Sequence, residues 1–216
     1  RQMCIRDRDL GRQEEGADFQ MVLIDELTNE IVVPNGTMGE RHTNPQKWNL
    51  RLENRDTGAK IDPRLSVFDQ REDVTVIKLP YFGDEEHEGI IERAIPTITV
   101  QTVDGPVKVT TVYDLILANY GIDRGIGGEV ATAYTDDTPY TPTWQEKITG
   151  VKADIAIATA REFADNAEKT KGRSMIIMGG GINHWYHADV IYRTILNLIM
   201  FCGTCLLYTS DAADEL

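Results

Sequence analysis

The residues with the clearest chemical potential lie in one loop, at positions 179–187, which reads Gly-Gly-Gly-Ile-Asn-His-Trp-Tyr-His. Glycines let backbone N–H groups approach a phosphate or a ring edge closely, because no Cβ stands in the way. An asparagine and two histidines then supply directional hydrogen-bonding groups. Spacing alone leaves two interpretations open, a ligand-binding loop and a tight connection with packed aromatic residues. The candidate ligand-binding residues are Gly179, Gly180, Gly181, Asn183, His184 and His187.

This loop matches none of the common short motifs. It has no third glycine for a dinucleotide fingerprint and no Lys-Ser/Thr pair for a P-loop. His184 and His187 resemble half of a zinc site, but no glutamate follows His184 and no other ligand cluster exists, so no metal ligand is predicted. Ser174 does not lie in a Gly-x-Ser-x-Gly elbow, which argues against a serine hydrolase.

The elements around the loop predict how it is positioned. Residues 154–167 have apolar residues on one helical stripe, and residues 188–202 have the same pattern. Between them, residues 174–178 (Ser-Met-Ile-Ile-Met) form a continuous apolar run that favours a buried parallel strand. The sequence thus predicts helix–strand–glycine loop–helix, part of a doubly wound parallel sheet. Ligands of such sheets bind beyond the carboxyl ends of the strands.

The first half is predicted to be β-rich and irregular. Residues 21–24 and 31–33 favour a hairpin, and residues 98–103 and 107–109 flank an Asp-Gly turn that favours another. A helix is predicted from residue 112 to 120. In the second half, Thr141-Pro142 gives an N-cap and a first-turn proline for a short helix that ends near Gly150. The fold class is therefore α/β, with a β-rich segment at 9–110 and an α/β cofactor-binding segment at 111–204.

Composition excludes several functions. The 216 residues contain 22 Lys and Arg against 35 Asp and Glu, a net charge of −13, and an acidic surface repels nucleic acid. No apolar run is long enough to predict a membrane span.

The two ends predict an artificial origin. Residues 1–8 and 205–216 are what a transposase-based sequencing adapter encodes when it is read in opposite senses. We expect both to be adapter scars, with an internal piece of a longer chain at 9–204. The Cys-Gly-Thr-Cys pattern at 202–205 then spans a scar boundary and is no metal or redox motif.

Several segments together resemble the catalytic (alpha) subunit of membrane-bound respiratory nitrate reductases. Residues 141–151 (Thr-Pro-Thr-Trp-Gln-Glu-Lys-Ile-Thr-Gly-Val) are similar to the wider molybdopterin oxidoreductase superfamily. Residues 183–187 (Asn-His-Trp-Tyr-His) point to its nitrate reductase branch, which includes the nitrite oxidoreductases. Residues 111–121, 160–166 and 172–175 fit the same subunit, and the resemblance is densest over 96–204.

This resemblance implies a bis(molybdopterin guanine dinucleotide) molybdenum cofactor and a 4Fe-4S cluster whose ligands lie outside the fragment. It implies reduction of nitrate to nitrite, with electrons relayed from quinol through a cytochrome b gamma subunit and an iron–sulfur beta subunit. Those partners would hold the subunit at the membrane. Two alternatives stay open: a nitrite oxidoreductase running the reverse reaction, and a non-catalytic paralogue that keeps only the fold.

The resemblance also implies roles for the loop. Asn183 and His184 would hydrogen-bond the pterin or orient the oxyanion near molybdenum, and His187 is a weaker candidate. The three glycines would allow close backbone approach. Because the molybdenum ligand of the family lies outside residues 9–204, the fragment is expected to be inactive on its own.

Overall fold

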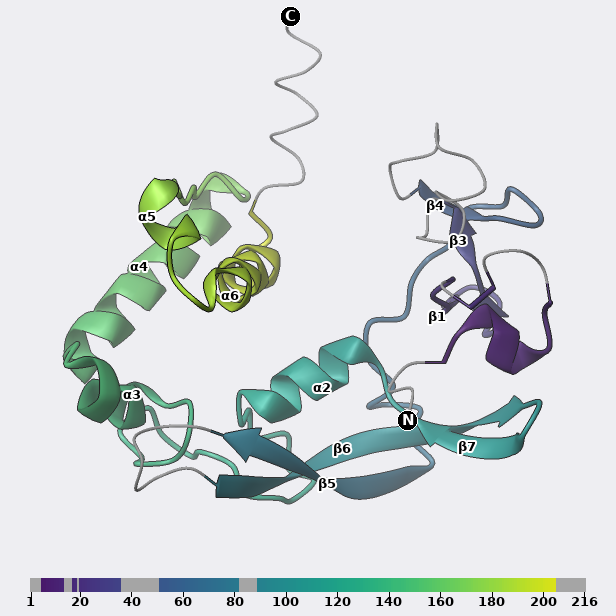
Figure 1. The fold of residues 1–216 in the computed structure, drawn as a ribbon, viewed down its shortest axis with the longest axis horizontal. Helices are drawn as coiled ribbons and strands as arrows, with labels where there is room; N and C mark the ends of the chain where they lie inside the picture. The colour runs from purple at the N-terminus through teal and green to yellow at the C-terminus, as the bar shows by residue number, and fades with distance from the viewer. Residues whose placement is uncertain (1–4, 14–16, 19, 36–50, 82–88, 205–216) are drawn as a thin grey trace, which may run out of the picture. The chain divides into compact units, whose positions relative to one another are not determined.

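The computed structural model describes residues 5–13, 17–18, 20–35, 51–81 and 89–204. The chain divides into two compact units, Arg1–Thr132 and Ala133–Leu216 (Figure 1). The predicted scar at 205–216 and the first four residues of the scar at 1–8 lie outside the described residues.

A three-stranded antiparallel sheet dominates the first unit (Figure 1). Its order is β5 (Asp73–Tyr81), β6 (Gly89–Thr102), β7 (Gly105–Val109). The β6–β7 hairpin confirms the predicted one, with Thr102 paired to Gly105 and a positive φ of 111° at that glycine. Helix α2 (Val112–Asn119) contacts β6 and belongs to the same unit.

Smaller antiparallel pairs complete the first unit. Strands β1 (Leu23–Ile24) and β2 (Ile31–Val32) form the other predicted hairpin, which confirms it. Strands β3 (Pro34–Asn35) and β4 (Arg51–Asn54) pair with each other, and a short 3-10 helix, η1, spans Asp7–Leu10. The buried apolar residues of this unit are Ala17, Val32, Val33, Ile61, Val67, Ile91, Ala94, Ile95, Val100 and Ala118.

A buried carboxylate ties α2 to the loop before the sheet. Asp114 is fully buried, and its oxygens accept hydrogen bonds from the Ser66 hydroxyl at 2.6 Å and the Val67 N–H at 2.9 Å. Its Oδ1 also lies 2.5 Å from Nη1 of Arg124, and its Oδ2 accepts from the Thr111 hydroxyl at 2.8 Å. Burial alone would raise the pKa of Asp114, but these hydrogen bonds together hold the pKa below its usual range.

Helices make up the regular structure of the second unit (Figure 1). Helix α3 (Pro142–Thr149) begins as the sequence predicts, with the Thr141 hydroxyl accepting from the N–H of Trp144 at 3.2 Å, and it ends at a left-handed Gly150. Helix α4 spans Ala153–Thr170. Two further helices follow the glycines: α5 (Gly180–Asn183) and α6 (Ala188–Phe201).

The mixed α/β class is confirmed, but the predicted parallel strand at 174–178 is not formed in the described part of the chain. Exposure alternates along this segment as in a strand. Ser174, Ile176 and Met178 are half-buried, whereas Met175 and Ile177 are 75% and 84% exposed. The prediction is wrong here because a parallel strand needs a neighbouring strand, and the described strands all pair antiparallel with one another, away from this segment. The described strands therefore form no doubly wound parallel sheet.

One further expectation concerns the membrane. Among the described residues, no helix combines the length and apolarity that crossing a bilayer requires.

Candidate functional site

The predicted loop forms a short helical turn between two extended or bent segments. Gly179 has an extended backbone (φ −133°, ψ −174°) and precedes the four residues of α5. His184 ends α5, and His187 precedes the first residue of α6. The backbone is held locally, because the N–H of Trp185 donates to Ile182 at 3.2 Å. The predicted polar residues therefore lie in one short stretch between α4 and α6.

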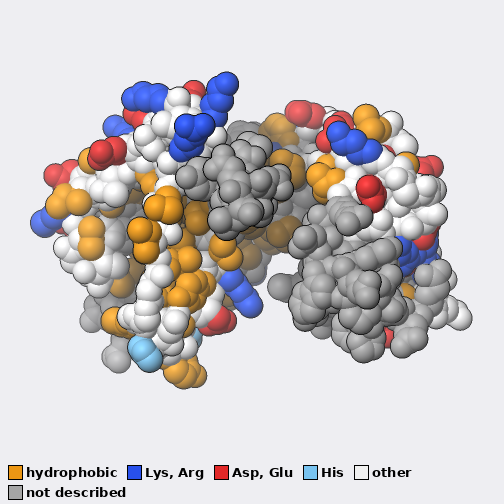
Figure 2. Space-filling model, turned by 90° about the horizontal axis from the view of Figure 1, so that it is seen from above, with side chains coloured by type: hydrophobic (Ala, Val, Ile, Leu, Met, Phe, Trp, Pro, Cys, Tyr) orange, Lys and Arg blue, Asp and Glu red, His pale blue; other side chains and the backbone are white. Residues whose placement is uncertain are grey.

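All of these polar side chains are exposed. Asn183, His184 and His187 are exposed, and the neighbouring Tyr186 is 93% exposed. The Tyr186 and His187 rings meet edge to face, with centroids 4.6 Å apart. In the space-filling view, histidine side chains (pale blue) lie among exposed hydrophobic side chains (orange) (Figure 2). The described loop thus offers donors and an aromatic ring on an open, largely apolar surface.

Within the described residues, no close neighbour requires glycine at these three positions. A Cβ built at Gly179, Gly180 or Gly181 would meet no atom within 4 Å, and none of the three has a positive φ. Gly172 in the same unit is different: its φ is +90°, and a Cβ there would lie 2.5 Å from the carbonyl oxygen of Gly203. Three consecutive glycines in open space leave the backbone accessible to an external group.

The structure adds a residue that the sequence analysis missed. The hydroxyl of Tyr192, on α6, donates a hydrogen bond to Oδ1 of Asn183. No sequence signal could have revealed this pair. A spacing of nine residues matches neither helical nor strand periodicity, and the contact depends on the path of the loop between α5 and α6.

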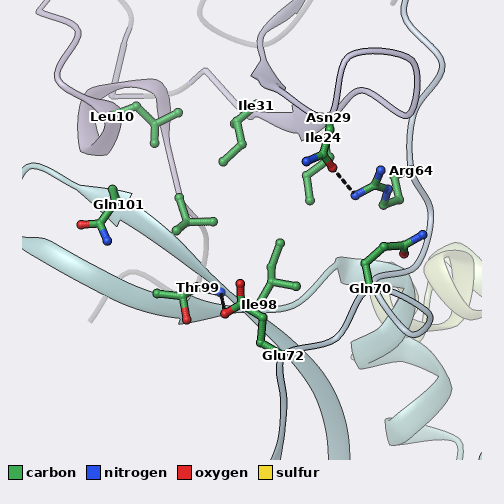
Figure 3. A pocket seen from close by; sticks show the side chains of 11 residues that line it. Leu10, Ile24, Asn29, Ile31, Arg64, Gln70, Glu72, Ile98, Thr99 and Gln101 are labelled. Atoms are coloured by element: carbon green, nitrogen blue, oxygen red, sulfur yellow. Dashed lines mark hydrogen bonds between the residues drawn. The ribbon is translucent and has the colours of Figure 1, made fainter.

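Other candidate sites do not involve the loop. Among the described residues, no three His, Cys, Asp or Glu side chains are grouped closely enough to hold a metal ion. The first unit contains a cavity of about 390 Å³ (Figure 3). Two hydrogen bonds organise its polar wall: the Thr99 N–H donates to Glu72 at 2.9 Å, and Arg64 donates to Asn29 at 2.8 Å. No predicted site residue lines this cavity.

Comparison with known proteins finds relatives that match most of this chain. No family model matches the chain. The nitrate reductase alpha chain of Bacillus subtilis is 44% identical over 196 residues, which is 91% of this chain. The respiratory nitrate reductase 1 alpha chain of Escherichia coli is 43% identical over 88% of this chain. The chain is homologous to part of the nitrate reductase alpha chains. The alpha subunit from Mycobacterium tuberculosis agrees, at 44% identity over 91% of this chain.

The homology with nitrate reductase alpha chains covers one segment of them. The chain spans about 16% of the length of each of these three relatives. It confirms the resemblance found from the sequence, although it does not test the roles of the loop residues.

Proposed function

We propose that the chain is part of the catalytic subunit of a molybdenum-dependent nitrate reductase that reduces nitrate to nitrite. The observation that carries this proposal is identity of 43–44% to nitrate reductase alpha chains over about nine tenths of the chain. The open glycine loop supports it, because no described residue packs against these glycines.

The cofactor proposed is bis(molybdopterin guanine dinucleotide) molybdenum, which would supply the electrons for reducing nitrate when it is bound. Gly179, Gly180 and Gly181 would let the backbone lie against it. Asn183 and His184 would donate hydrogen bonds to the pterin or to the oxyanion, and His187 is the weaker candidate for a third donor. Donors fixed before the reaction stabilise the charge that develops on a departing oxygen, because they need no reorganisation in the transition state.

The rest of the enzyme is proposed from the same homology. Electrons would pass from quinol through a cytochrome b gamma subunit and an iron–sulfur beta subunit to a 4Fe-4S cluster whose ligands lie outside this segment. These partners would hold the catalytic subunit at the membrane. The printed names of two relatives describe them as respiratory, which supports an electron-transport role.

The test is His184→Ala in the complete reductase. We expect turnover of nitrate to fall by about 10²–10³, the usual cost of losing one donor to a developing oxyanion. The molybdenum content should fall much less. Tyr134→Phe, on an exposed tyrosine of the same unit, is the control and should leave both values unchanged. Wild-type turnover in a cofactor-loaded His184→Ala enzyme would contradict the role of His184. Failure of the wild-type enzyme to reduce nitrate would contradict the proposed function itself.

A further inference from the structure

Asn183 is the one predicted site residue whose side chain the structure holds by a hydrogen bond within the described residues. Its Oδ1 accepts from the hydroxyl of Tyr192, which lies in the second turn of α6 and is half-buried. A side-chain amide has one accepting oxygen and one donating nitrogen, so a bond to the oxygen fixes which way the nitrogen points.

The amide nitrogen is left available. Among the described residues, no group accepts a hydrogen bond from Nδ2 of Asn183, and the side chain is exposed. The donating face of the amide therefore points away from Tyr192 and toward space that the described chain does not fill. This arrangement suits a ligand atom that accepts hydrogen bonds.

We propose that Tyr192 is a positioning residue that makes Asn183 a hydrogen-bond donor to the bound cofactor or oxyanion. This inference rests on the proposed function of the loop. Tyr192 acts through Asn183 and does not touch the ligand. Its ring is carried by a helix of fourteen residues and has few rotatable bonds, so it restrains the amide with little freedom of its own. Without the Tyr192 hydroxyl, the amide could turn its oxygen toward the accepting atom of the ligand. Two accepting atoms repel each other, so the hydrogen bond to the ligand would be lost.

Three substitutions in the complete reductase separate the possible roles. Tyr192→Phe removes one oxygen atom and keeps the ring, and we expect kcat/KM to fall about tenfold, as for the loss of one net hydrogen bond. Asn183→Ala should cost at least as much. Asn183→Asp keeps an acceptor for the Tyr192 hydroxyl but removes the donor, so it should be as impaired as Asn183→Ala. Tyr134→Phe is the matched control and should behave like the wild type.

The double variant Tyr192→Phe/Asn183→Ala gives the deciding result. If Tyr192 acts only through Asn183, the double variant equals Asn183→Ala alone. Fully additive losses would overturn the proposal, as would wild-type activity of Asn183→Asp. The molybdenum and pterin content of each purified enzyme gives a second readout. Reduced content in both single variants indicates a bond to the cofactor, whereas full content with a raised KM for nitrate indicates a bond to the oxyanion.

The outcomes also distinguish this inference from the proposed function. An impaired Asn183→Ala enzyme with a wild-type Tyr192→Phe enzyme overturns only the positioning role. Wild-type behaviour of both, in an enzyme that reduces nitrate, removes Asn183 and Tyr192 from the site but leaves the function. Absence of nitrate reduction in the wild-type enzyme removes the function on which both rest.

Discussion

The two units differ in how completely they bury their apolar side chains. The first unit buries Ile61 and Val67 to 1% and 0% exposure. In the described part of the second unit, Ala167 is the only fully buried apolar residue, while Met175 and Ile177 are largely exposed. The unit with its own core carries no predicted site residue, and the unit that carries the candidate site has an open apolar surface. Large exposed apolar surfaces are typical of interaction sites. The site therefore lies in the unit whose stability depends least on its own core.

Removing the buried charge should produce the largest effect and should be confined to the first unit. Asp114→Ala leaves Arg124 without its buried carboxylate and removes the hydrogen bonds to Ser66 and Val67. We expect the free energy of unfolding of the first unit to fall by about 3–5 kcal/mol. Hydrogen exchange across β6 in increasing urea measures it. Asp69→Ala, an exposed aspartate in the same loop, is the control. An equal loss of protection in α4 would break the contrast between the units.

Shortening one buried and one exposed isoleucine tests the same difference in burial between the two units. Ile61→Ala creates a cavity in the first unit and should cost about 2–5 kcal/mol. Ile177→Ala removes the same atoms from an exposed position, and the stability of the second unit should stay within about 0.5 kcal/mol of the wild type. Urea unfolding of the 216-residue chain, followed by hydrogen exchange in each unit, compares the two. A large loss from Ile177→Ala would mean that this side chain is covered.

Acid should weaken the first unit more than the second. The pKa values of Asp25, Asp56, Asp73 and Asp114 lie below their usual range, mainly through hydrogen bonds to their carboxylates. A lowered pKa in the folded state gives stability that is complete above the unfolded pKa of about 3.9 and is lost as the pH falls through the folded value. The urea concentration at the unfolding midpoint of the first unit should therefore decrease once the pH falls below about 4. In Asp114→Asn, the urea midpoint should decrease less steeply with falling pH. An unchanged dependence on pH would show that the pKa of Asp114 does not differ between the folded and unfolded states.

Features set by adjacent residues could be predicted from the sequence. The Thr141-Pro142 start and the Gly150 end of α3 depend on capping within one turn, and the structure confirms them. The β6–β7 hairpin likewise follows from its Asp104-Gly105 turn. Such features depend only on residues that are close together in the sequence.

Features that depend on distant residues could not be predicted. The run at 174–178 has strand composition, but strand formation requires a neighbour that the described residues do not provide. Asp114 joins residues 47 and 48 positions away in the sequence, a distance at which no periodicity applies. The Tyr192 contact to Asn183 depends on how the loop turns. Residue types and the family resemblance were enough to predict the candidate site, but the hydrogen bond that holds Asn183 could be found only in the structure.

The smallest expected effect lies in the exposed ion pair between α3 and α4. The ammonium of Lys152 lies 2.6 Å from Glu146 Oε1, and each group shifts the pKa of its partner: the pKa of Glu146 is lowered and that of Lys152 is raised. Both groups titrate in water, where Coulomb attraction is screened and side-chain ordering opposes it. Lys152→Gln should therefore leave the melting temperature of the chain unchanged within error at physiological salt.

Glu146 gives the matched comparison, because its other oxygen accepts from the N–H of Ala153 at 2.9 Å and so satisfies the first turn of α4. The Lys152 side chain provides no such cap. Glu146→Ala should therefore reduce exchange protection at the start of α4, whereas Lys152→Gln should not. Equal effects from the two variants would mean that the ion pair stabilises the junction. The second unit would then depend on surface charge where the first depends on burial.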